Sequence, residues 1–442
     1  MNFVLAKKIE KSIFYIFLFS LPFSIKKFLF SLHPPLGGDF SFFLYLADVL
    51  FFLLLIFWLW RVVLQREKIK IDKIDLVFLF LVFWVFLSSL WSLNPLFSLI
   101  FGLRLFLFFL LVLYLKNNLK NFSFKSSLFI IFCSLIIESL IATLQFFNQA
   151  SLGLRILGEP IFSPLVLGAA KFSVFGVKFV RPPGTLAHAN ILAAFLVFGL
   201  VFSFALFEAV YQKPSKNKIF LLTTYFLADF ILFLALLLTF SRSGWLVFFV
   251  GFVGFFGWLV FFGNMKKKNY IVLLVFLILV GLISLFIFKD FIFVRTHINL
   301  QEKAINLRLV YQKIAFSLFE KAPLLGVGFG NYLLAVKKFD LWQKFGINFS
   351  YLYQPVHNIY LLWLSETGLV GLFGFLLLNL LVLKKAFLKI LREKGNLYLL
   401  AAFLIQIGFL LWGLSDHFFY DLVLGRYLFW LSFGFLSFLA LS

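Results

Sequence analysis

The 442-residue sequence has little charge, few acidic residues and one cysteine. Charged residues make up only 13% of the chain, whereas 63% of the residues are hydrophobic and 71 are Phe. A soluble domain of this length could not bury so much apolar surface, so the composition predicts an integral membrane protein. The single cysteine, Cys133, lies in an apolar run. A single cysteine excludes an intramolecular disulfide, and it does not indicate whether the protein lies in an oxidising or a reducing compartment.

The shortage of acidic residues gives the chain a strongly positive net charge. The chain has 18 Asp and Glu residues and 40 Lys and Arg residues, which gives a formal net charge of +22 at pH 7. The basic residues occur in short clusters between apolar runs, which is the pattern of the positive-inside rule. We therefore expect a lipid bilayer as the partner and no nucleic acid. At the N-terminus, Lys7, Lys8 and Lys11 precede an apolar run without a small-x-small cleavage site, which predicts an uncleaved signal anchor.

Hydrophobic segments recur along the whole chain. A bilayer core needs about 20 apolar residues per helix. By that measure the sequence predicts about twelve segments, near 12–31, 41–61, 75–93, 96–115, 126–149, 186–210, 218–240, 244–263, 269–288, 357–383, 396–414 and 422–441. The first is the weakest, because Pro22, Lys26 and Lys27 interrupt it. The predicted fold is an all-α polytopic membrane protein of about twelve transmembrane helices.

The charge of the short connecting loops predicts the orientation of these segments. Basic clusters alternate with connections that hold only Lys26, Lys27 and Arg242. Because basic short loops stay in the cytoplasm, both termini are predicted to be cytoplasmic. The two long loops, 150–185 and 289–356, are then external, and the protein is expected as a multi-pass protein of the cytoplasmic membrane.

Parts of the two long loops are predicted to be ordered. Apolar residues at helical intervals predict a helix over 301–321 that ends before Pro323. The partly alternating stretch 171–185 predicts a short hairpin or a re-entrant loop. The glycines at 326, 328 and 330 are interpreted as turn glycines, since no strand precedes them and no ATP is present outside the membrane.

Ionisable residues inside apolar segments are costly and usually functional. Following the direction of each segment, Asp48, Arg104, Glu366 and Arg426 all fall in the outer half. They therefore predict a cavity that faces outward. A transporter is expected to carry such groups at the midplane between related halves, so a twelve-segment transporter or lipid flippase remains only an alternative.

A cluster in the last external turn has two possible interpretations. Asp416-His417-x-x-x-Asp421 combines two carboxylates with one histidine, which are possible metal ligands. We favour a solvated capping turn, and we expect no metal and no cofactor.

Three motifs occur in order in the second half of the chain. They are Ser-Arg-Ser-Gly at 241–244, Arg-x-x-Tyr leading to Pro-x-x-Gly at 308–326, and His-Asn with a later Gly-x-x-Gly at 357–371. In this order, and with this sidedness and loop length, they resemble the shared core of the O-antigen ligases and related polysaccharide polymerases over roughly residues 181–375. The first five segments show nothing diagnostic. The resemblance implies a GT-C-like membrane glycosyltransferase with an external, partly helical loop.

The resemblance also implies roles for individual residues. Arginines of the family bind the pyrophosphate of the donor, a role that falls here to Arg242 and Arg308, with Arg181 as a third candidate. The family histidine activates the acceptor, which makes His357 the candidate catalytic residue. A water-satisfied histidine at the membrane interface is the alternative for His357. The supporting residues expected around this site are Asn358, His188, Asn190, Gly368 and Gly371. For His188, a helix-start role and substrate contact are equally compatible with the sequence.

Elementary chemistry leads to the same kind of reaction. No nucleotide sugar is present outside the membrane, so an activated sugar must arrive on a polyprenyl pyrophosphate. That leaving group departs as an anion, which planar, permanently charged arginines stabilise. A hydroxyl acceptor benefits from a base, and neutral histidine is suitable. We expect metal-independent transfer by direct attack, with inversion at the anomeric carbon.

The acceptor and the domain boundaries are less constrained. A glycan, a lipid or a protein could supply the hydroxyl, so the sequence does not separate a ligase from a polymerase that uses another lipid-linked glycan. The predicted organisation is an N-terminal membrane region at 1–180, a catalytic core at 181–383 that includes the loop 289–356, and C-terminal helices at 384–442.

Overall fold

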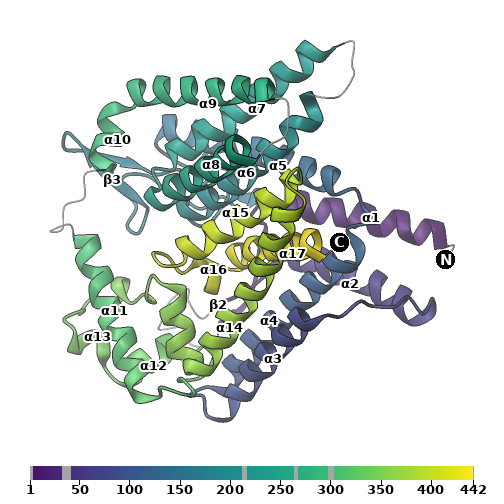
Figure 1. Cartoon of the computed structure of the whole chain (residues 1–442). Helices are drawn as coiled ribbons and strands as arrows, with labels where there is room; N and C mark the ends of the chain where they lie inside the picture. The colour runs from purple at the N-terminus through teal and green to yellow at the C-terminus, as the bar shows by residue number, and fades with distance from the viewer. Residues whose placement is uncertain (1–2, 32–40, 212–216, 263–266, 297–302, 442) are drawn as a thin grey trace. The chain divides into compact units, whose positions relative to one another are not determined.

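The computed structural model describes residues 3–31, 41–211, 217–262, 267–296 and 303–441 (Figure 1). The described chain is helical apart from two short hairpins and the connecting loops. It forms two compact units that alternate along the sequence. The first unit comprises Met1–Glu67, Leu119–His297 and Ile390–Phe409, and the second comprises Lys68–Asn118, Ile298–Lys389 and Leu410–Ser442.

Ten helices of the described residues are long and apolar enough to cross a membrane. They are α2 (Leu46–Leu64), α3 (Lys73–Leu87), α4 (Pro95–Asn118), α5 (Phe124–Asn148), α6 (Ala189–Tyr211), α7 (Lys218–Leu238), α8 (Arg242–Phe262), α9 (Lys267–Ile287), α14 (Ile359–Arg392) and α17 (Val423–Leu441). Each corresponds to one of the twelve predicted segments. An eleventh segment forms α15 (Leu397–Trp412), which is apolar but shorter. The prediction of an all-α polytopic membrane protein is confirmed.

The first predicted segment, 12–31, is wrong in its second half. Helix α1 (Phe3–Ser20) ends before Pro22, and β1 (Lys26–Ser31) pairs antiparallel with β2 (Ser41–Tyr45). Proline cannot continue a helix because it lacks an amide hydrogen and clashes with the preceding turn. The ammonium group of Lys26 lies 4.6 Å from the centre of the Phe43 ring on the paired strand. A single helix over 12–31 is therefore replaced by a helix and a strand.

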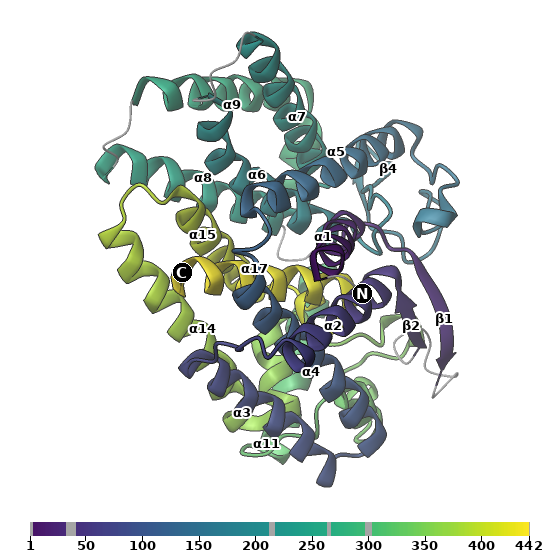
Figure 2. The same ribbon diagram turned by 90° about the vertical axis from the view of Figure 1, so that its right-hand side faces the viewer.

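Helix α6 lies at the centre of the first unit. It packs against α5, α7 and α8 (Figure 2), and 94% of its membrane-length window is buried. A helix that is apolar all round can be stable only when neighbours cover every face. Helix α1 packs against α2 and α5. A buried hydrogen bond of 2.9 Å from Arg61 to Glu10 joins α1 to α2, with both side chains 1% exposed.

A second hairpin follows the short helical turn η4 (Arg155–Leu157) in the first unit. Strands β3 (Lys171–Val174) and β4 (Val177–Val180) pair antiparallel, which confirms the hairpin predicted over 171–185. The hairpin lies beside α10 (Lys289–Thr296) in Figure 1. Aromatic rings fill this contact: Phe172 is 4.6 Å from Phe240 and Phe179 is 4.9 Å from Phe291, between ring centres.

The second unit is built on α3, η3 (Ser88–Leu90) and α4, with α17 packed along α4 (Figure 1). Asp72 caps α3, because its carboxylate accepts a 2.8 Å hydrogen bond from the Ile74 amide. Lys116 near the end of α4 pairs with Asp75 and lies 3.3 Å from the Asp72 carboxylate. These contacts fasten the two ends of the helical hairpin together.

The long loop folds into helices with their own core in the second unit. These are α11 (Lys303–Lys321), α12 (Tyr332–Lys338), α13 (Leu341–Lys344) and η5 (Ser350–Leu352). Ile314 and Leu318 of α11 are 1% and 0% exposed, which confirms the helix predicted over 301–321. Trp342 stacks on Tyr353 at 4.1 Å between ring centres. The core also includes Leu362 of α14, so the loop helices pack against the beginning of that helix.

Candidate functional site

His357 lies two residues before α14. Asn358 forms the cap of this helix: its Oδ1 accepts hydrogen bonds from the amides of Tyr360 (2.9 Å) and Leu361 (3.0 Å). The side-chain amide of Asn358 donates to the carbonyl of Leu414 at 3.1 Å. Asparagine is among the preferred residues at this position. Asn358 thus fixes the backbone next to His357 through the helix start.

The ring of His357 lies between two other rings. It stacks on Tyr311 of α11, with 5.8 Å between ring centres and an angle of 15°. It also meets His417 edge-to-face, at 4.7 Å and 89°. The Nδ1 atom of His357 is buried and has no hydrogen-bond partner among the described residues. The hydroxyl of Tyr311 donates to the carbonyl of Leu352 at 2.7 Å, which fixes the stacking surface.

His357 is a neutral imidazole near pH 7. Burial lowers its pKa to about 4, and the positive charges of His417 and Arg308 act in the same direction. The carboxylates of Asp416 and Asp421 oppose this shift without cancelling it. A neutral ring has a nitrogen lone pair that can accept a hydrogen bond or a proton.

His417 is held by a carboxylate. Its Nδ1 atom lies 2.7 Å from Oδ2 and 2.9 Å from Oδ1 of Asp421, which ends the short helix α16 (Phe418–Asp421). The amide of His417 donates to Asp416 at 2.8 Å. The sequence interpretation of a capping turn therefore missed the contact between the His417 ring and Asp421. The spacing of four residues, which places two side chains on one helical face, was the available signal.

Arg308 lies on α11 one turn before Tyr311. Its side chain is exposed, and it is close enough to His357 to lower the pKa of that histidine. Within the described residues no carboxylate pairs with Arg308. The structure thus brings together Arg308 and His357, two of the three residues that the motifs selected for chemistry.

The glycine-rich turn after α11 docks onto a break in α14. Gly368 has φ 65° and ψ −168° and interrupts the helix. The interruption leaves the carbonyls of Ser365 and Glu366 accessible, and they accept hydrogen bonds from the amides of Val327 (3.0 Å) and Gly328 (2.9 Å). The glycines at 326, 328 and 330 all have positive φ, which confirms their interpretation as turn glycines.

The side chain of Glu366 makes further hydrogen bonds between α14 and the glycine-rich turn. Its carboxylate accepts hydrogen bonds from the amides of Gly330 (2.7 Å) and Tyr332 (2.9 Å), and from the hydroxyl of Tyr420 on α16. The sequence placed Glu366 among the buried charges of an outward cavity but did not identify these partners. Glu366 therefore joins the glycine-rich turn to the helix that follows His417.

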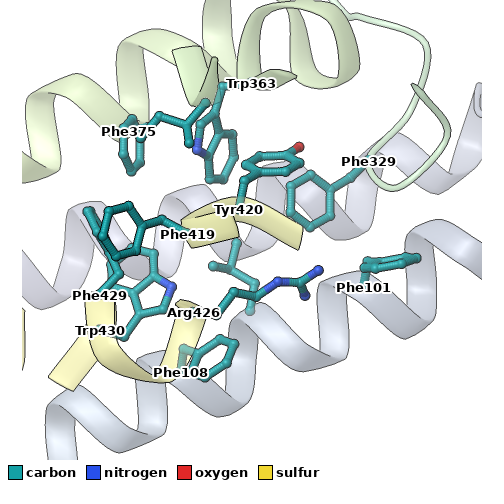
Figure 3. A pocket seen from close by; sticks show the side chains of 12 residues that line it. Phe101, Phe108, Phe329, Trp363, Phe375, Phe419, Tyr420, Arg426, Phe429 and Trp430 are labelled. Carbon is teal, nitrogen blue, oxygen red and sulfur yellow. The ribbon is translucent and has the colours of Figure 1, made fainter. Parts of the chain in front are cut away.

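A pocket lined mostly by aromatic rings lies among α4, α14, α16 and α17 (Figure 3). Arg426 points into it and is 6% exposed. The guanidinium carbon is 5.2 Å from the centre of the Phe101 ring, and one N–H donates to the carbonyl of Asp421 at 2.8 Å. Arg426 thus binds the end of the same short helix that presents His417 and Tyr420.

The first unit contains the other predicted residues, around the turn between α7 and α8. Arg181, just after β4, donates from Nε to the carbonyl of Thr239 at 2.7 Å and from an Nη to Oδ1 of Asn190. Asn190 also accepts a 3.0 Å hydrogen bond from the hydroxyl of Ser241. The turn itself includes Phe240 at φ 47°, a value that non-glycine residues rarely adopt.

Arg242 begins α8 directly after this turn, and its side chain is partly exposed. His188 accepts a 3.1 Å hydrogen bond at Nδ1 from the amide of Asn190, which places it at the start of α6. Arg295 of α10 donates to the carbonyl of Phe240 at 3.2 Å, a contact that the sequence gave no reason to expect. Arg181, His188, Asn190 and Arg242 thus gather within the first unit, whereas Arg308, His357, Asn358, Gly368 and Gly371 lie in the second.

Gly371 lies one turn after the break in α14. A Cβ atom at this position would lie 2.0 Å from Oγ1 of Thr367. That hydroxyl donates to the carbonyl of Trp363 at 2.6 Å. Gly371 therefore leaves space for the Thr367 side chain next to the break.

Comparison with known proteins finds a similarity for the central part of the chain. No curated protein matches the sequence. Residues 227–376 match the family model described as O-antigen ligase. The match includes Arg242, Arg308, His357, Gly368 and Gly371, and it begins after Arg181, His188 and Asn190. Residues 227–376, which begin within α7 and end just after the break in α14, are thus similar to the O-antigen ligase family, as the three motifs predicted. They lie within a multi-pass membrane protein.

Proposed function

We propose that the protein transfers a glycan from a polyprenyl-pyrophosphate donor to an acceptor hydroxyl at the outer face of the cytoplasmic membrane. The family match supports the broader activity, a membrane ligase or polymerase of lipid-linked glycans. The observation that carries the proposal is that a neutral histidine, His357, lies within electrostatic range of an exposed arginine, Arg308, in the matched region. One residue is suited to the acceptor and the other to the leaving group.

The donor is proposed to bind through arginines. Arg308 is exposed and has no carboxylate partner among the described residues, so an anionic ligand does not have to displace an ion pair. From the sequence motifs alone, Arg242 at the start of α8 and Arg181 are proposed as further donor-binding residues. The contacts of Arg181 with Thr239 and Asn190 also fix the turn from which Arg242 extends. Guanidinium groups bind pyrophosphate oxygens in a bidentate manner and keep their charge when buried by substrate.

The acceptor is proposed to bind at His357. Since the pKa of this histidine is lowered to about 4, the ring is neutral at pH 7 and can act as the base that accepts the proton of the hydroxyl. The hydroxyl proton passes to His357 as the acceptor oxygen attacks the anomeric carbon, and the bond from that carbon to the pyrophosphate oxygen breaks. The arginines stabilise the negative charge that develops on the leaving group. The proposed step needs no metal and inverts the anomeric centre.

The proposal also includes the orientation of the chain. Both termini are proposed to be cytoplasmic, with the loops 150–185 and 289–356 outside. This orientation follows from the basic clusters in the short loops. The acceptor can be another lipid-linked glycan, which makes the protein a polymerase, or a lipid or protein, which makes it a ligase.

The test is transfer by the full-length protein in liposomes, with lipid-linked glycans from membranes of the source cells as donor and released polyprenyl pyrophosphate as readout. We expect Arg308→Ala to abolish release and Arg308→Lys to reduce it about 5- to 150-fold, because lysine keeps the charge and loses the planar fork, at a cost of about 1–3 kcal/mol. Lys337→Ala is the control, since Lys337 is an exposed cation of the same loop. Wild-type release by a folded Arg308→Ala protein would contradict the proposal.

A further inference from the structure

The loop helices of the second unit carry a basic surface. Residues 306–350 contain six basic and two acidic residues, a formal net charge of +4. The six basic side chains are exposed, and within the described part of the chain no carboxylate forms an ion pair with any of them: Arg308, Lys313, Lys321, Lys337, Lys338 and Lys344. By contrast, Arg61, Lys116 and Lys385 in other segments pair with carboxylates. The charge of this surface is thus left for a partner to neutralise.

Two of these lysines, from different helices, share one aromatic ring. The ammonium group of Lys321, at the end of α11, lies 4.4 Å from the centre of the Phe339 ring. That of Lys338, at the end of α12, lies 5.9 Å from the same centre. The two charges of this lysine pair are therefore at most roughly 10 Å apart, about the Debye length at physiological ionic strength, so their repulsion is only partly screened. An anion bound between them would relieve it.

The acidic neighbours do not neutralise the lysine pair. Glu320 precedes Lys321 and Asp340 follows Phe339 in the sequence, and both acidic side chains are exposed. Among the residues that the structure describes, neither carboxylate forms an ion pair with Lys321 or Lys338. The ring of Phe339 is itself 36% exposed. An anionic group from outside the chain therefore meets two cations that an aromatic ring already holds in place.

The lysine pair lies at the opposite end of α11 from the candidate site. Arg308 and Tyr311, which face His357, are near the beginning of this helix, and Lys321 ends it. A helix rises 1.5 Å per residue, so Arg308 and Lys321 are about 20 Å apart along its axis. One pyrophosphate cannot contact both ends, whereas a chain of several sugar units can. An anion at the lysine pair is therefore better supplied by the glycan than by the lipid pyrophosphate.

We propose that the lysine pair, Lys321 and Lys338, binds acidic groups of the glycan, carboxylate or phosphate, several sugar units from the reacting hydroxyl. This rests on the proposed function, which makes a glycan the substrate. No bond changes at the lysine pair. Its role is to favour acidic glycans over neutral ones through charge complementarity, with Phe339 orienting the two ammonium groups.

The first experiment measures binding without transfer. Full-length protein in phosphatidylcholine nanodiscs is titrated with fluorescent oligogalacturonate, which carries a carboxylate on each sugar, and with its methyl ester, in which the same sugars are neutral. We expect the acidic form to bind, and its binding to weaken as salt is added. The ester should bind at least about 10-fold more weakly, because it loses several charge contacts at once. Equal binding of the two forms, or binding of neither, overturns the proposal.

A pair of variants separates the lysine pair from net charge. Lys338→Glu and Lys337→Glu change the net charge equally at adjacent exposed positions, but of these two lysines it is Lys338 that lies over Phe339 among the described contacts. We expect Lys338→Glu and Lys321→Glu each to weaken oligogalacturonate binding about 10-fold, and Lys337→Glu at most about 2-fold. Phe339→Leu should weaken it about 2- to 5-fold, the scale of an exposed cation–π contact. Equal losses for Lys337→Glu and Lys338→Glu overturn the assignment.

Two further results distinguish the glycan from a lipid surface and from failure of the proposed function. Binding of phosphatidylglycerol vesicles that Lys338→Glu abolishes, without binding of oligogalacturonate, assigns the lysine pair to lipid headgroups and overturns the proposal. In the liposome assay described above, absence of transfer by the wild-type protein overturns the proposed function, whatever the binding result. Normal transfer by a protein that does not bind oligogalacturonate overturns the role of the lysine pair alone.

Discussion

The break in α14 at Gly368 is predicted to require glycine. Its φ of 65° and ψ of −168° fall in a region that is almost exclusive to glycine. A Cβ atom added at Gly368 would also lie 2.1 Å from the carbonyl oxygen of Leu324 and 2.6 Å from the amide nitrogen of Leu325. These are backbone atoms and cannot rotate away. Gly368→Ala should therefore displace the glycine-rich turn from α14.

The expected cost has two parts. The backbone conformation costs about 1–3 kcal/mol for a residue with a side chain. Displacement of the turn breaks at least one of the hydrogen bonds from Val327, Gly328 and Leu369 across the contact, at about 0.5–1.5 kcal/mol each. We expect Gly368→Ala to lower the free energy of unfolding by about 2–4 kcal/mol.

The assay combines unfolding in detergent micelles with hydrogen exchange of the Val327 and Gly328 amides, which should exchange faster in the variant. The control is Gly281→Ala in α9, where an added Cβ meets no atom within 4 Å. Gly326→Ala tests the opposite side, since its Cβ would lie 2.3 Å from the carbonyl carbon of Glu366. The double variant Gly326→Ala/Gly368→Ala should cost less than the sum of the two. Unchanged stability and exchange in Gly368→Ala would refute the reasoning.

Four further outcomes are expected. Glu366→Gln should lower the free energy of unfolding by about 1–3 kcal/mol, because an amide leaves at least one of three buried donors unpaired; equal unfolding curves would contradict this. The pKa of His357 is about 4 when folded and about 6.5 when unfolded, so its contribution to stability is complete above pH 6.5 and is lost as the pH falls through 4. His357→Gln should reduce the acid sensitivity of unfolding in this window, and an identical pH profile would speak against burial of the ring. A reporter fused after Lys338 should be active only outside the cytoplasm, and cytoplasmic activity would reverse the topology. Transfer should persist in excess EDTA, whereas loss that magnesium or manganese restores would assign a metal to the reaction.

The sequence was most informative where one physical requirement dominates. Ten membrane-length helices were predictable because a bilayer imposes a long apolar run on each of them. The helix over 303–321 and the hairpin over 171–180 followed from periodicity. The first segment was wrong because apolar content alone does not separate a helix from the strand at Lys26–Ser31. The helix α1 ends before Pro22, and the strand β1 follows it.

The details of the candidate site could not be obtained in the same way. Sequence motifs selected Arg308 and His357, and the structure brings them together. The contact between His357 and His417 depends on the packing of two segments sixty residues apart, which periodicity does not encode. The break in α14 was also hidden, because its apolar pattern continues on both sides of Gly368.

Helix α16 connects these features within the second unit. At its beginning His417 contacts His357, and within the same turn Tyr420 donates a hydrogen bond to Glu366. Glu366 in turn holds the glycine-rich turn that follows α11, and α11 provides the Tyr311 ring on which His357 stacks. The position of His357 is thus determined from two sides by one connected set of contacts. Because packed contacts of this kind shift together, a substitution at Glu366 should alter the environment of His357 although the two side chains have no direct contact among the described interactions.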